Sequence, residues 1–249
     1  MTKPSFDSTA LKDFSQAQGL LLTRYAESTI PTEYGFFRVI CYREYLPTSY
    51  GGERFFKEHL AVVKGQPEGK EGVLARVHSE CLTGEVLHSL KCDCREQLDY
   101  ALRAIASANT GVVLYLRQEG RGIGLGNKIR AYALQEKGVD TVDANRMLGF
   151  PDDARRFDVA ARMLADLEVR SIVLLTNNPY KVKALREEGV QILRREPVPI
   201  HPNRYNAAYL HTKGQRMGHE LMGHPMDESK APPVPPHRLI EVPHDPQVE

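Results

Sequence analysis

The first third of the chain carries short apolar runs of the kind that form β-strands. These runs cover residues 35–45, 60–65 and 73–80, are rich in β-branched and aromatic side chains, and are separated by Gly, Pro and Thr. Residues 1–28 differ from them, because their apolar positions form one short block without a regular period. The pattern therefore predicts a strand-rich N-terminal third that follows an irregular or helical leader over residues 1–28.

The hydrophobic period changes from that of strands to that of helices after residue 94. Leu98, Ala101, Leu102 and Ile105 recur at the i, i+3, i+4, i+7 spacing of one helix face, within a predicted helix over residues 95–109. Further along, continuous apolar runs of strand length alternate with helical segments: strands at 111–116, 171–176 and 190–193, helices at 126–138, 157–169 and 179–189. This alternation after a strand-rich beginning predicts the fold class α/β, with a mixed β-sheet and flanking helices.

The C-terminal segment is distinguished by its proline content. Residues 225–249 hold seven of the sixteen prolines, including the run PPVPP at 232–236. Proline lacks a backbone N–H and fixes φ, so this density disfavours both helix and sheet ladder. We therefore expect a Pro-rich tail over residues 223–249 that is extended or disordered, and a single folded domain over residues 29–222.

Charge and hydropathy bear on the class of partner. Lys plus Arg total 33 against 32 for Asp plus Glu, a formal net charge of +1. Such a balance gives no support for a nucleic-acid or membrane-surface partner. The sequence also lacks both an apolar run approaching the roughly 18 residues of a membrane span and the apolar core of a signal peptide. We expect a cytoplasmic protein that binds neither nucleic acid nor membrane.

The cysteines are clustered, which points to metal chemistry. Three of the four, Cys81, Cys92 and Cys94, fall within 14 residues at the spacing C-x10-C-x-C. If Gly84 makes a turn between them, three thiolates can converge on one tetrahedral ion. Three protein ligands leave one position open, as in catalytic zinc sites, where the metal makes a nucleophile of its water. We expect Cys41, in an apolar run, to belong to the core.

The same spacing allows two simpler interpretations of the cysteine cluster. A structural zinc site would close with a fourth ligand, for which His78 and His88 are the candidates. Alternatively, the thiols are buried and bind nothing, since free cysteine often packs as a small apolar residue.

Four motifs in order resemble GTP cyclohydrolase II. They are RVHSECLTG at 76–84, CDC at 92–94 with Gln97 after it, RQEGRGIGL-x-NKIRAYAL at 117–134 and LLTNNPYKV at 174–182. The resemblance runs from about residue 31 to 218. It implies a catalytic domain over residues 29–222, zinc dependence, Mg²⁺ with the triphosphate, and a homodimer. A chain of this length is expected to lack the dihydroxybutanone-phosphate synthase domain that some relatives carry.

The reaction that the resemblance implies is the first step of riboflavin biosynthesis. GTP is hydrolysed at its guanine imidazole ring, with release of formate and pyrophosphate, to 2,5-diamino-6-(5-phosphoribosylamino)pyrimidin-4(3H)-one. Two other functions stay open from the sequence. One is an enzyme on the same scaffold that retains the formyl group, and the other is a non-catalytic, zinc-containing GTP sensor.

The resemblance also implies roles for individual residues. Cys81, Cys92 and Cys94 would hold zinc. Tyr132, Asp153 and Arg155 would be catalytic, with Asp153 as proton acceptor and Arg155 as nucleophile towards the α-phosphate. The implied GTP contacts are Arg76, Val77, His78, Ser79, Glu80, Gln97, Glu119, Gly120, Arg121, Thr141, Thr176 and Lys181.

Elementary chemistry refines three of these implied roles. The Glu119 carboxylate suits guanine, whose N1–H and amino group form a donor pair that adenine lacks. A guanidinium stays protonated at ordinary pH, so a transition-state phosphate clamp suits Arg155 better than covalent catalysis. Without the motif around it, Tyr132 would fit better as an amphipathic core tyrosine.

Three departures from the family pattern stand near these motifs. Arg95 replaces a glycine after CDC, Gly126 replaces a leucine at the start of a helix, and Ala154 lies where an acidic residue is common. None of them removes a proposed ligand or catalytic group.

Overall fold

A computed structural model describes residues 21–50, 53–207 and 210, and it contains one central seven-stranded sheet. The strands lie in the order β1-β2-β3-β5-β4-β6-β7. The pairs β1–β2, β2–β3 and β3–β5 are antiparallel. The pairs β5–β4, β4–β6 and β6–β7 are parallel. The strands are β1 (Leu21–Thr32), β2 (Gly35–Tyr50), β3 (Glu53–Lys64), β4 (Val73–Ser79), β5 (Gly111–Leu116), β6 (Ile172–Leu175) and β7 (Ile192–Glu196).

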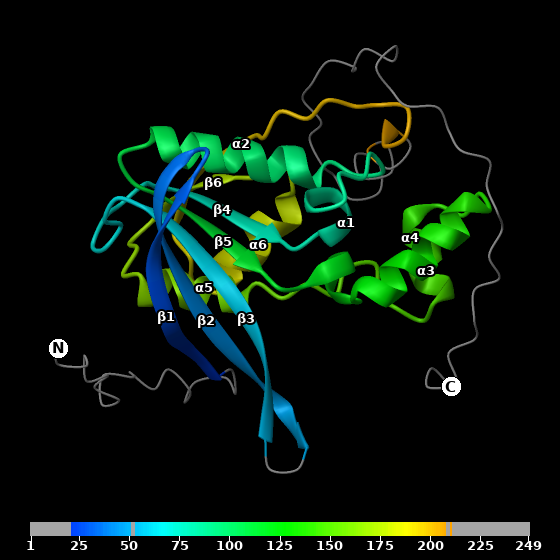
Figure 1. Cartoon of the computed structure of the whole chain (residues 1–249), viewed down its shortest axis with the longest axis horizontal. Coiled ribbons are helices and arrows are strands. Elements are labelled where there is room, and N and C mark those ends of the chain that lie inside the picture. The colour runs from blue at the N-terminus through cyan, green and yellow to red at the C-terminus, as the bar shows by residue number, and fades with distance from the viewer. Residues whose placement is uncertain (1–20, 51–52, 208–209, 211–249) are drawn as a thin grey trace.

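Helices cover both faces of this sheet. The helices are α1 (Leu82–Glu85), α2 (Cys94–Ser107), α3 (Leu125–Glu136), α4 (Thr141–Met147), α5 (Asp158–Asp166) and α6 (Pro179–Glu187), with a 3₁₀ turn η3 (Glu119–Gly122). In one core cluster α2 packs with Phe37 and Val113, and in the other α5 and α6 pack with the opposite face of the sheet. Figure 1 shows α2 on one side of the strands and α5 on the other. The predicted α/β fold with a mixed sheet and flanking helices is confirmed.

Strand β5 illustrates why the central elements could be predicted. Its side chains alternate between the two cores: Val112 and Leu114 join the cluster of α5 and α6, while Val113 joins that of α2. Successive side chains of a strand point to opposite faces. A strand covered by helices on both faces therefore has a continuous apolar sequence.

The expected leader over residues 1–28 is wrong for its described part. Residues 21–28 belong to β1, which pairs with β2 from Leu21 opposite Tyr45 to Thr32 opposite Gly35. In β1 Leu22 is buried, while every side chain from residue 25 to 32 is exposed. An edge strand exposed in this way does not need alternating apolar residues. Its sequence therefore lacks the period of a strand and is like that of an irregular segment. The antiparallel ribbon of β2 and β3 continues beyond the rest of the sheet (Figure 1).

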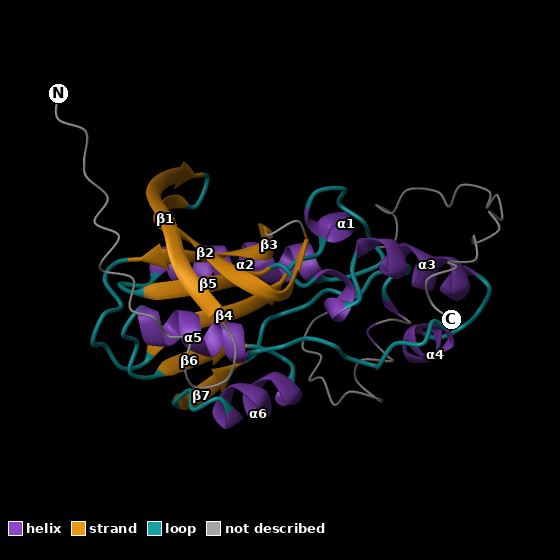
Figure 2. Ribbon diagram, turned by 90° about the horizontal axis from the view of Figure 1, so that it is seen from below, coloured by secondary structure: helices purple, strands orange, loops and turns teal. Residues whose placement is uncertain are grey.

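Helices α3 and α4 lie beyond one end of the sheet, apart from its two faces (Figure 2). The sequence pattern predicts α3 but does not predict α4, which begins after Asp140, whose carboxylate accepts hydrogen bonds from the backbone N–H groups of Val142 and Asp143. The expected Pro-rich tail over residues 223–249 lies outside the described residues. Over the described residues, no helix is long and apolar enough to cross a membrane.

Candidate active site

The motifs meet because three parallel strands end at the same edge of the sheet. Strands β4, β5 and β6 end at Ser79, Leu116 and Leu175. The segment after β5 carries the motif at 117–134. The segments after β4 and β6 complete the motifs at 76–84 and 174–182. In open α/β sheets the carboxyl ends of parallel strands form the crevice in which ligands bind. Here α3 and α4 lie opposite that edge (Figure 1), and a pocket lies between them and the strands.

All but two of the predicted site residues line this pocket. Val77 is buried within β4, and Asp153 contacts Arg155, which does line the pocket. The predicted residues in the lining are Arg76, His78, Ser79, Glu80, Cys81, Cys92, Cys94, Gln97, Glu119, Gly120, Arg121, Tyr132, Thr141, Arg155, Thr176 and Lys181.

The three clustered cysteines converge at one wall of the pocket. Cys81 follows β4 and precedes α1, while Cys94 is the first residue of α2. The sulfur atoms of the three cysteines lie within 4.8 Å of one another, and those of Cys81 and Cys92 are 3.6 Å apart. Cys92 and Cys94 do not lie on a strand. Cys92 is in the loop before α2 and Cys94 begins α2, and the change of direction between them brings both sulfurs to the cluster.

The donor set fits a zinc ion. Zinc–sulfur bonds of about 2.3 Å in a tetrahedron separate two ligand sulfurs by about 3.8 Å, close to the distance between Cys81 and Cys92. Hydrogen bonds with Cys92 and Cys94, and then with Lys128, outweigh burial and lower the pKa of Cys81 below its ordinary value. A thiolate is the form of cysteine that binds metal. Among the described residues this is the one group of three or more potential ligands that converges in this way.

Packing requires a glycine at position 84. Gly84, the candidate for a turn between the cysteines, lies in α1, a helix of four residues between Cys81 and Cys92. A Cβ atom at this position would lie 2.8 Å from the sulfur of Cys92 and 3.2 Å from that of Cys81. These distances are shorter than van der Waals contact, so only glycine lets the helix approach the sulfur cluster.

The variant Gly84→Ala is therefore expected to displace the Cys92 sulfur. We expect zinc affinity to fall by about 10- to 100-fold, the usual cost of disturbing groups that orient metal ligands. Competition with a chromogenic chelator measures this affinity. Gly126→Ala is the matched control, because a Cβ there meets no atom within 4 Å, and it should stabilise α3 by up to about 1 kcal/mol. Wild-type zinc affinity in Gly84→Ala would show that the space beside the sulfurs is not limiting.

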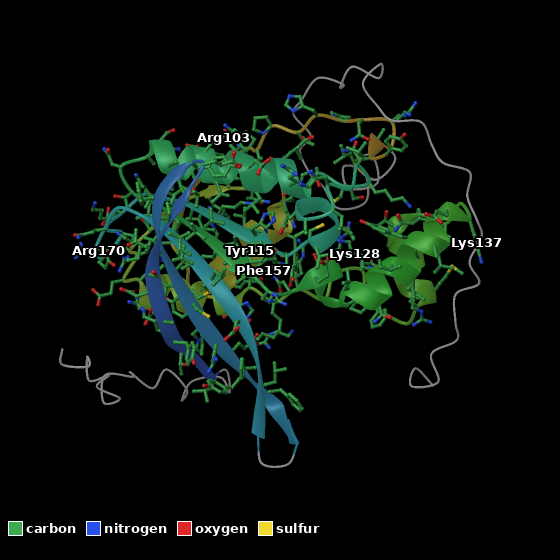
Figure 3. All side chains as sticks on the ribbon, in the orientation of Figure 1. Arg103, Tyr115, Lys128, Lys137, Phe157 and Arg170 are labelled. Atoms are coloured by element: carbon green, nitrogen blue, oxygen red, sulfur yellow. The ribbon has the colours of Figure 1, made fainter. Side chains whose placement is uncertain are left out.

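A buried ion pair supports the cysteine cluster from α3. Lys128 Nζ donates to Cys81 Sγ at 3.0 Å and to Glu119 Oε1 at 2.8 Å. Burial lowers the pKa of Lys128, but Tyr132, Cys81 and Glu119 raise it by more, so the net shift is upward. Lys128 lies on the part of α3 nearest the sheet, whereas Lys137 follows the far end of the helix (Figure 3). The ammonium group thus offsets thiolate charge inside the protein.

Both carboxylate oxygens of Glu119 accept hydrogen bonds from the protein. Oε1 accepts from Lys128 and from the backbone N–H of Gly120, and Oε2 accepts from the backbone N–H of Leu82 at 2.6 Å. These contacts tie the 3₁₀ turn η3 to the start of α1, next to the cysteines. The contact of Glu119 with guanine stays a prediction.

The pocket is also lined by buried cationic side chains. Lys181, on α6, donates from Nζ to the carbonyl of Val77 at 2.6 Å, and Arg76 donates to the carbonyl of Leu175 at 2.9 Å and to the amide oxygen of Gln97. Desolvation lowers the pKa of Arg76 to about 10, which still leaves the guanidinium charged at neutral pH. Arg76 thus links β4 to β6, and Lys181 links α6 to β4, and both place positive charge at the carboxyl ends of the strands.

Arg155 is held by a two-point ion pair with Asp153. Arg155 Nε and Nη2 donate to the two oxygens of Asp153 at 2.8 and 2.5 Å, and the backbone N–H of Arg155 donates to the same carboxylate at 3.0 Å. Burial raises the pKa of Asp153, but the hydrogen bonds and charge of Arg155 lower it by more. A planar guanidinium bound at two points has little rotational freedom, so Asp153 orients Arg155 at the pocket.

Two ammonium groups lie near the ring of Tyr132. The Nζ atoms of Lys91 and Lys128 are 5.2 and 5.8 Å from the centre of its ring. The ring therefore packs against polar groups of the pocket, and Tyr132 is one of the lining residues.

The motif comparison omits several residues that line the pocket. Lys128 and Asn178 are the most informative, because both are buried and polar. Asn178 Oδ1 accepts from the backbone N–H of Tyr180 and Lys181 and so caps α6, as the sequence predicts. Its Nδ2 has no hydrogen-bond partner among the described residues. Lys128 precedes Tyr132 by four residues, about one helical turn. This spacing is the sequence signal that predicts both side chains on the same face of α3.

The three departures from the family pattern leave the pocket intact. Arg95 lies in the first turn of α2, is half-buried and pairs with Asp99. Ala154 donates its backbone N–H to the carbonyl of Arg121 at 3.0 Å, a bond that does not depend on the side chain. Nothing lies within 4 Å of a Cβ built at Gly126.

Comparison with known proteins agrees with the motifs. The family model described as GTP cyclohydrolase II matches residues 23–197. A GTP cyclohydrolase-2 of Actinobacillus succinogenes is 49% identical, over 81% of this chain and 89% of that protein. One of Histophilus somni strain 2336 is 52% identical, over 79% and 88%. One of Haemophilus influenzae strain PittEE is 50% identical, over 82% and 90%. With this family match and half of its aligned residues shared with such relatives, the chain belongs to the GTP cyclohydrolase II family of enzymes.

Proposed function

We propose that this enzyme hydrolyses GTP with a zinc ion held by Cys81, Cys92 and Cys94. The guanine imidazole ring is opened, formate and pyrophosphate are released, and 2,5-diamino-6-(5-phosphoribosylamino)pyrimidin-4(3H)-one is the product, as the first step of riboflavin biosynthesis. The observation that carries this proposal is that the sulfur cluster shares one pocket with the cationic groups of Arg155 and Lys181. The pocket thus offers a metal-binding set and counter-charges for a triphosphate together.

The three cysteines in the pocket lining support the proposal that ring opening takes place beside them. When bound, zinc supplies a Lewis acid that makes water nucleophilic near neutral pH. Lys128 donates to Cys81 and is itself held by Glu119, so these two side chains orient the metal ligands. Tyr132 faces the same wall, and we assign its hydroxyl the role of donating or accepting a proton at the opening ring.

Arg155 and Lys181 support the assignment of the phosphate end. A triphosphate accompanied by Mg²⁺ keeps negative charge that guanidinium and ammonium groups bind. Asp153 accepts both hydrogen bonds of the guanidinium edge of Arg155 and so fixes its direction before substrate arrives. We assign Arg155 the role of clamping the phosphate in the transition state, because preorganised charge needs no rearrangement during the reaction.

The products released from GTP test the proposal directly. The zinc-loaded enzyme is expected to release formate and pyrophosphate in equal amounts, measured by coupled assays on the same sample. Pyrophosphate without formate would establish the formyl-retaining reaction in its place. If the protein binds GTP yet leaves its absorption spectrum unchanged for hours, it acts as a sensor. The homodimer and the cytoplasmic location stay predictions, to be tested by sedimentation and by cell fractionation.

A further inference from the structure

Two buried ionisable side chains on the antiparallel ribbon take no part in the proposed reaction. Glu44, on β2, is 4% exposed and His59, on β3, is 2% exposed. Neither lines the pocket of the candidate active site. Burial raises the pKa of Glu44, but His59 and then Arg156 lower it by more, so the carboxylate is charged at neutral pH. A buried charge is costly unless it is paired, so its partners indicate what it does.

His59 connects Glu44 to the segment that follows β5. The backbone N–H of Arg117 donates to His59 Nδ1 at 3.0 Å. Because Nδ1 accepts this bond, the ring proton lies on Nε2, which is 3.0 Å from Glu44 Oε2 and donates to it. Arg117 is the first residue after β5 and leads into η3, the 3₁₀ turn that carries Glu119 and Arg121.

Glu44 reaches the segment of Asp153 and Arg155 through its other oxygen. Arg156 Nη1 donates to Glu44 Oε1 at 3.1 Å, and the backbone N–H of Arg156 donates to Gln118 Oε1, also at 3.1 Å. On the other side of Arg155, the backbone N–H of Ala154 donates to the carbonyl of Arg121 at 3.0 Å. The residues on both sides of Arg155 are therefore bound to the segment that His59 holds.

The two segments also pack without spare room. A Cβ atom at Gly122 would lie 2.7 Å from the carbonyl oxygen of Ala154. A small cavity beside this contact is lined by Glu44, His59, Gln118 and Ala154, and it shares no lining residue with the candidate active site. The support for Arg155 thus comes from residues that do not line the pocket of the candidate active site.

We propose that Glu44 and His59 are positioning residues that hold the segment 153–156, and with it the guanidinium of Arg155, against the loop after β5. This inference rests on the proposed function, in which Arg155 clamps phosphate. A displacement of about 1 Å at such a group costs on the order of 10²-fold in rate. The network joins residue 44 on β2, residue 59 on β3 and residues 117 and 118 after β5 to residue 156, which lies next to Arg155 in the loop of the catalytic pair.

Amide hydrogen exchange tests the positioning without reference to turnover. In Glu44→Gln, which keeps the side-chain volume, and in His59→Asn, which is too short to keep the bond from Nε2 to Glu44, the amides of Ala154 and Arg156 are expected to exchange about tenfold faster, while those of β5 keep their wild-type rates. Arg156→Met removes the same link from an exposed side chain and should act likewise without a folding defect. Wild-type exchange at residues 154 and 156 in all three variants would overturn the inference, whatever the activity of the enzyme.

Kinetics then separate positioning from general destabilisation. We expect kcat for pyrophosphate release to fall about 10- to 100-fold in the three variants, with KM within threefold of wild type. Arg156→Met, at an exposed side chain, should also keep its wild-type Tm. Arg194→Met, another exposed arginine in an ion pair, is the control and should match wild type. In an Arg155→Lys background Glu44→Gln should have no further effect, because residues that act as a unit are not additive.

Additive losses in that double variant would show that Glu44 acts on the fold and not through Arg155, and would overturn the inference. A wild-type enzyme that releases neither pyrophosphate nor formate would instead overturn the proposed function, and hydrogen exchange would still decide whether Glu44 and His59 hold the segment.

Discussion

Replacing Cys92 by serine is expected to abolish zinc binding and guanine ring opening together. The Cys92 sulfur lies 3.6 Å from that of Cys81, at the distance expected for two ligands of one tetrahedral ion. A serine hydroxyl stays protonated near neutral pH and is a harder donor than a thiolate, so only two thiolates would remain. We expect formate release to fall by at least about 10³-fold, equivalent to a barrier higher by about 4 kcal/mol.

Metal content and formate release measure the two losses on the same sample. Cys41→Ala is the matched control, since Cys41 lies on β2 and is not part of the sulfur cluster. The control should keep full zinc content and activity, and circular dichroism should show both variants folded. Full ring opening by Cys92→Ser without bound zinc would remove the metal from the proposed mechanism.

Replacing Arg155 by glutamine is expected to suppress pyrophosphate release with zinc content unchanged. Arg155 is bound at two points by Asp153, so its charge is fixed in direction at the pocket. Removing one preorganised donor of this kind costs about 10²- to 10³-fold in kcat. Arg155→Lys keeps the charge but loses the planar fork, so we expect it to recover only a small part of the loss.

Rapid quench with radiolabelled GTP measures the step that Arg155 serves. Arg194→Gln removes a comparably paired but exposed arginine on β7, and it should behave as wild type. Intact mass spectrometry of the quenched enzyme distinguishes the two roles considered for Arg155. A clamp leaves the protein mass unchanged, whereas a nucleophile adds a guanylyl group. Unchanged pyrophosphate release in Arg155→Gln would exclude both roles.

The central elements could be predicted because their burial determines the hydrophobic pattern of their own residues. Strand β5 is apolar at every position since both of its faces are covered, and α2 carries an apolar stripe because one face packs on the sheet. Strand β1 could not be predicted in the same way. Its pairing with β2 comes from backbone hydrogen bonds, and these leave no period in an exposed edge strand.

The candidate site could likewise be predicted only in part. Clustered cysteines and ordered motifs indicate by themselves a metal-binding enzyme of the GTP cyclohydrolase II family, because ligand type and spacing are properties of the chain. The close approach of Gly84 to two sulfurs, the bond from Lys128 to Cys81 and the support of Arg156 by Glu44 are decided only by the tertiary structure. The contacts of Lys128 with Cys81 and of Glu44 with Arg156 join residues 47 and 112 positions apart in the sequence. No local period reports such contacts, since they depend on how separate elements pack.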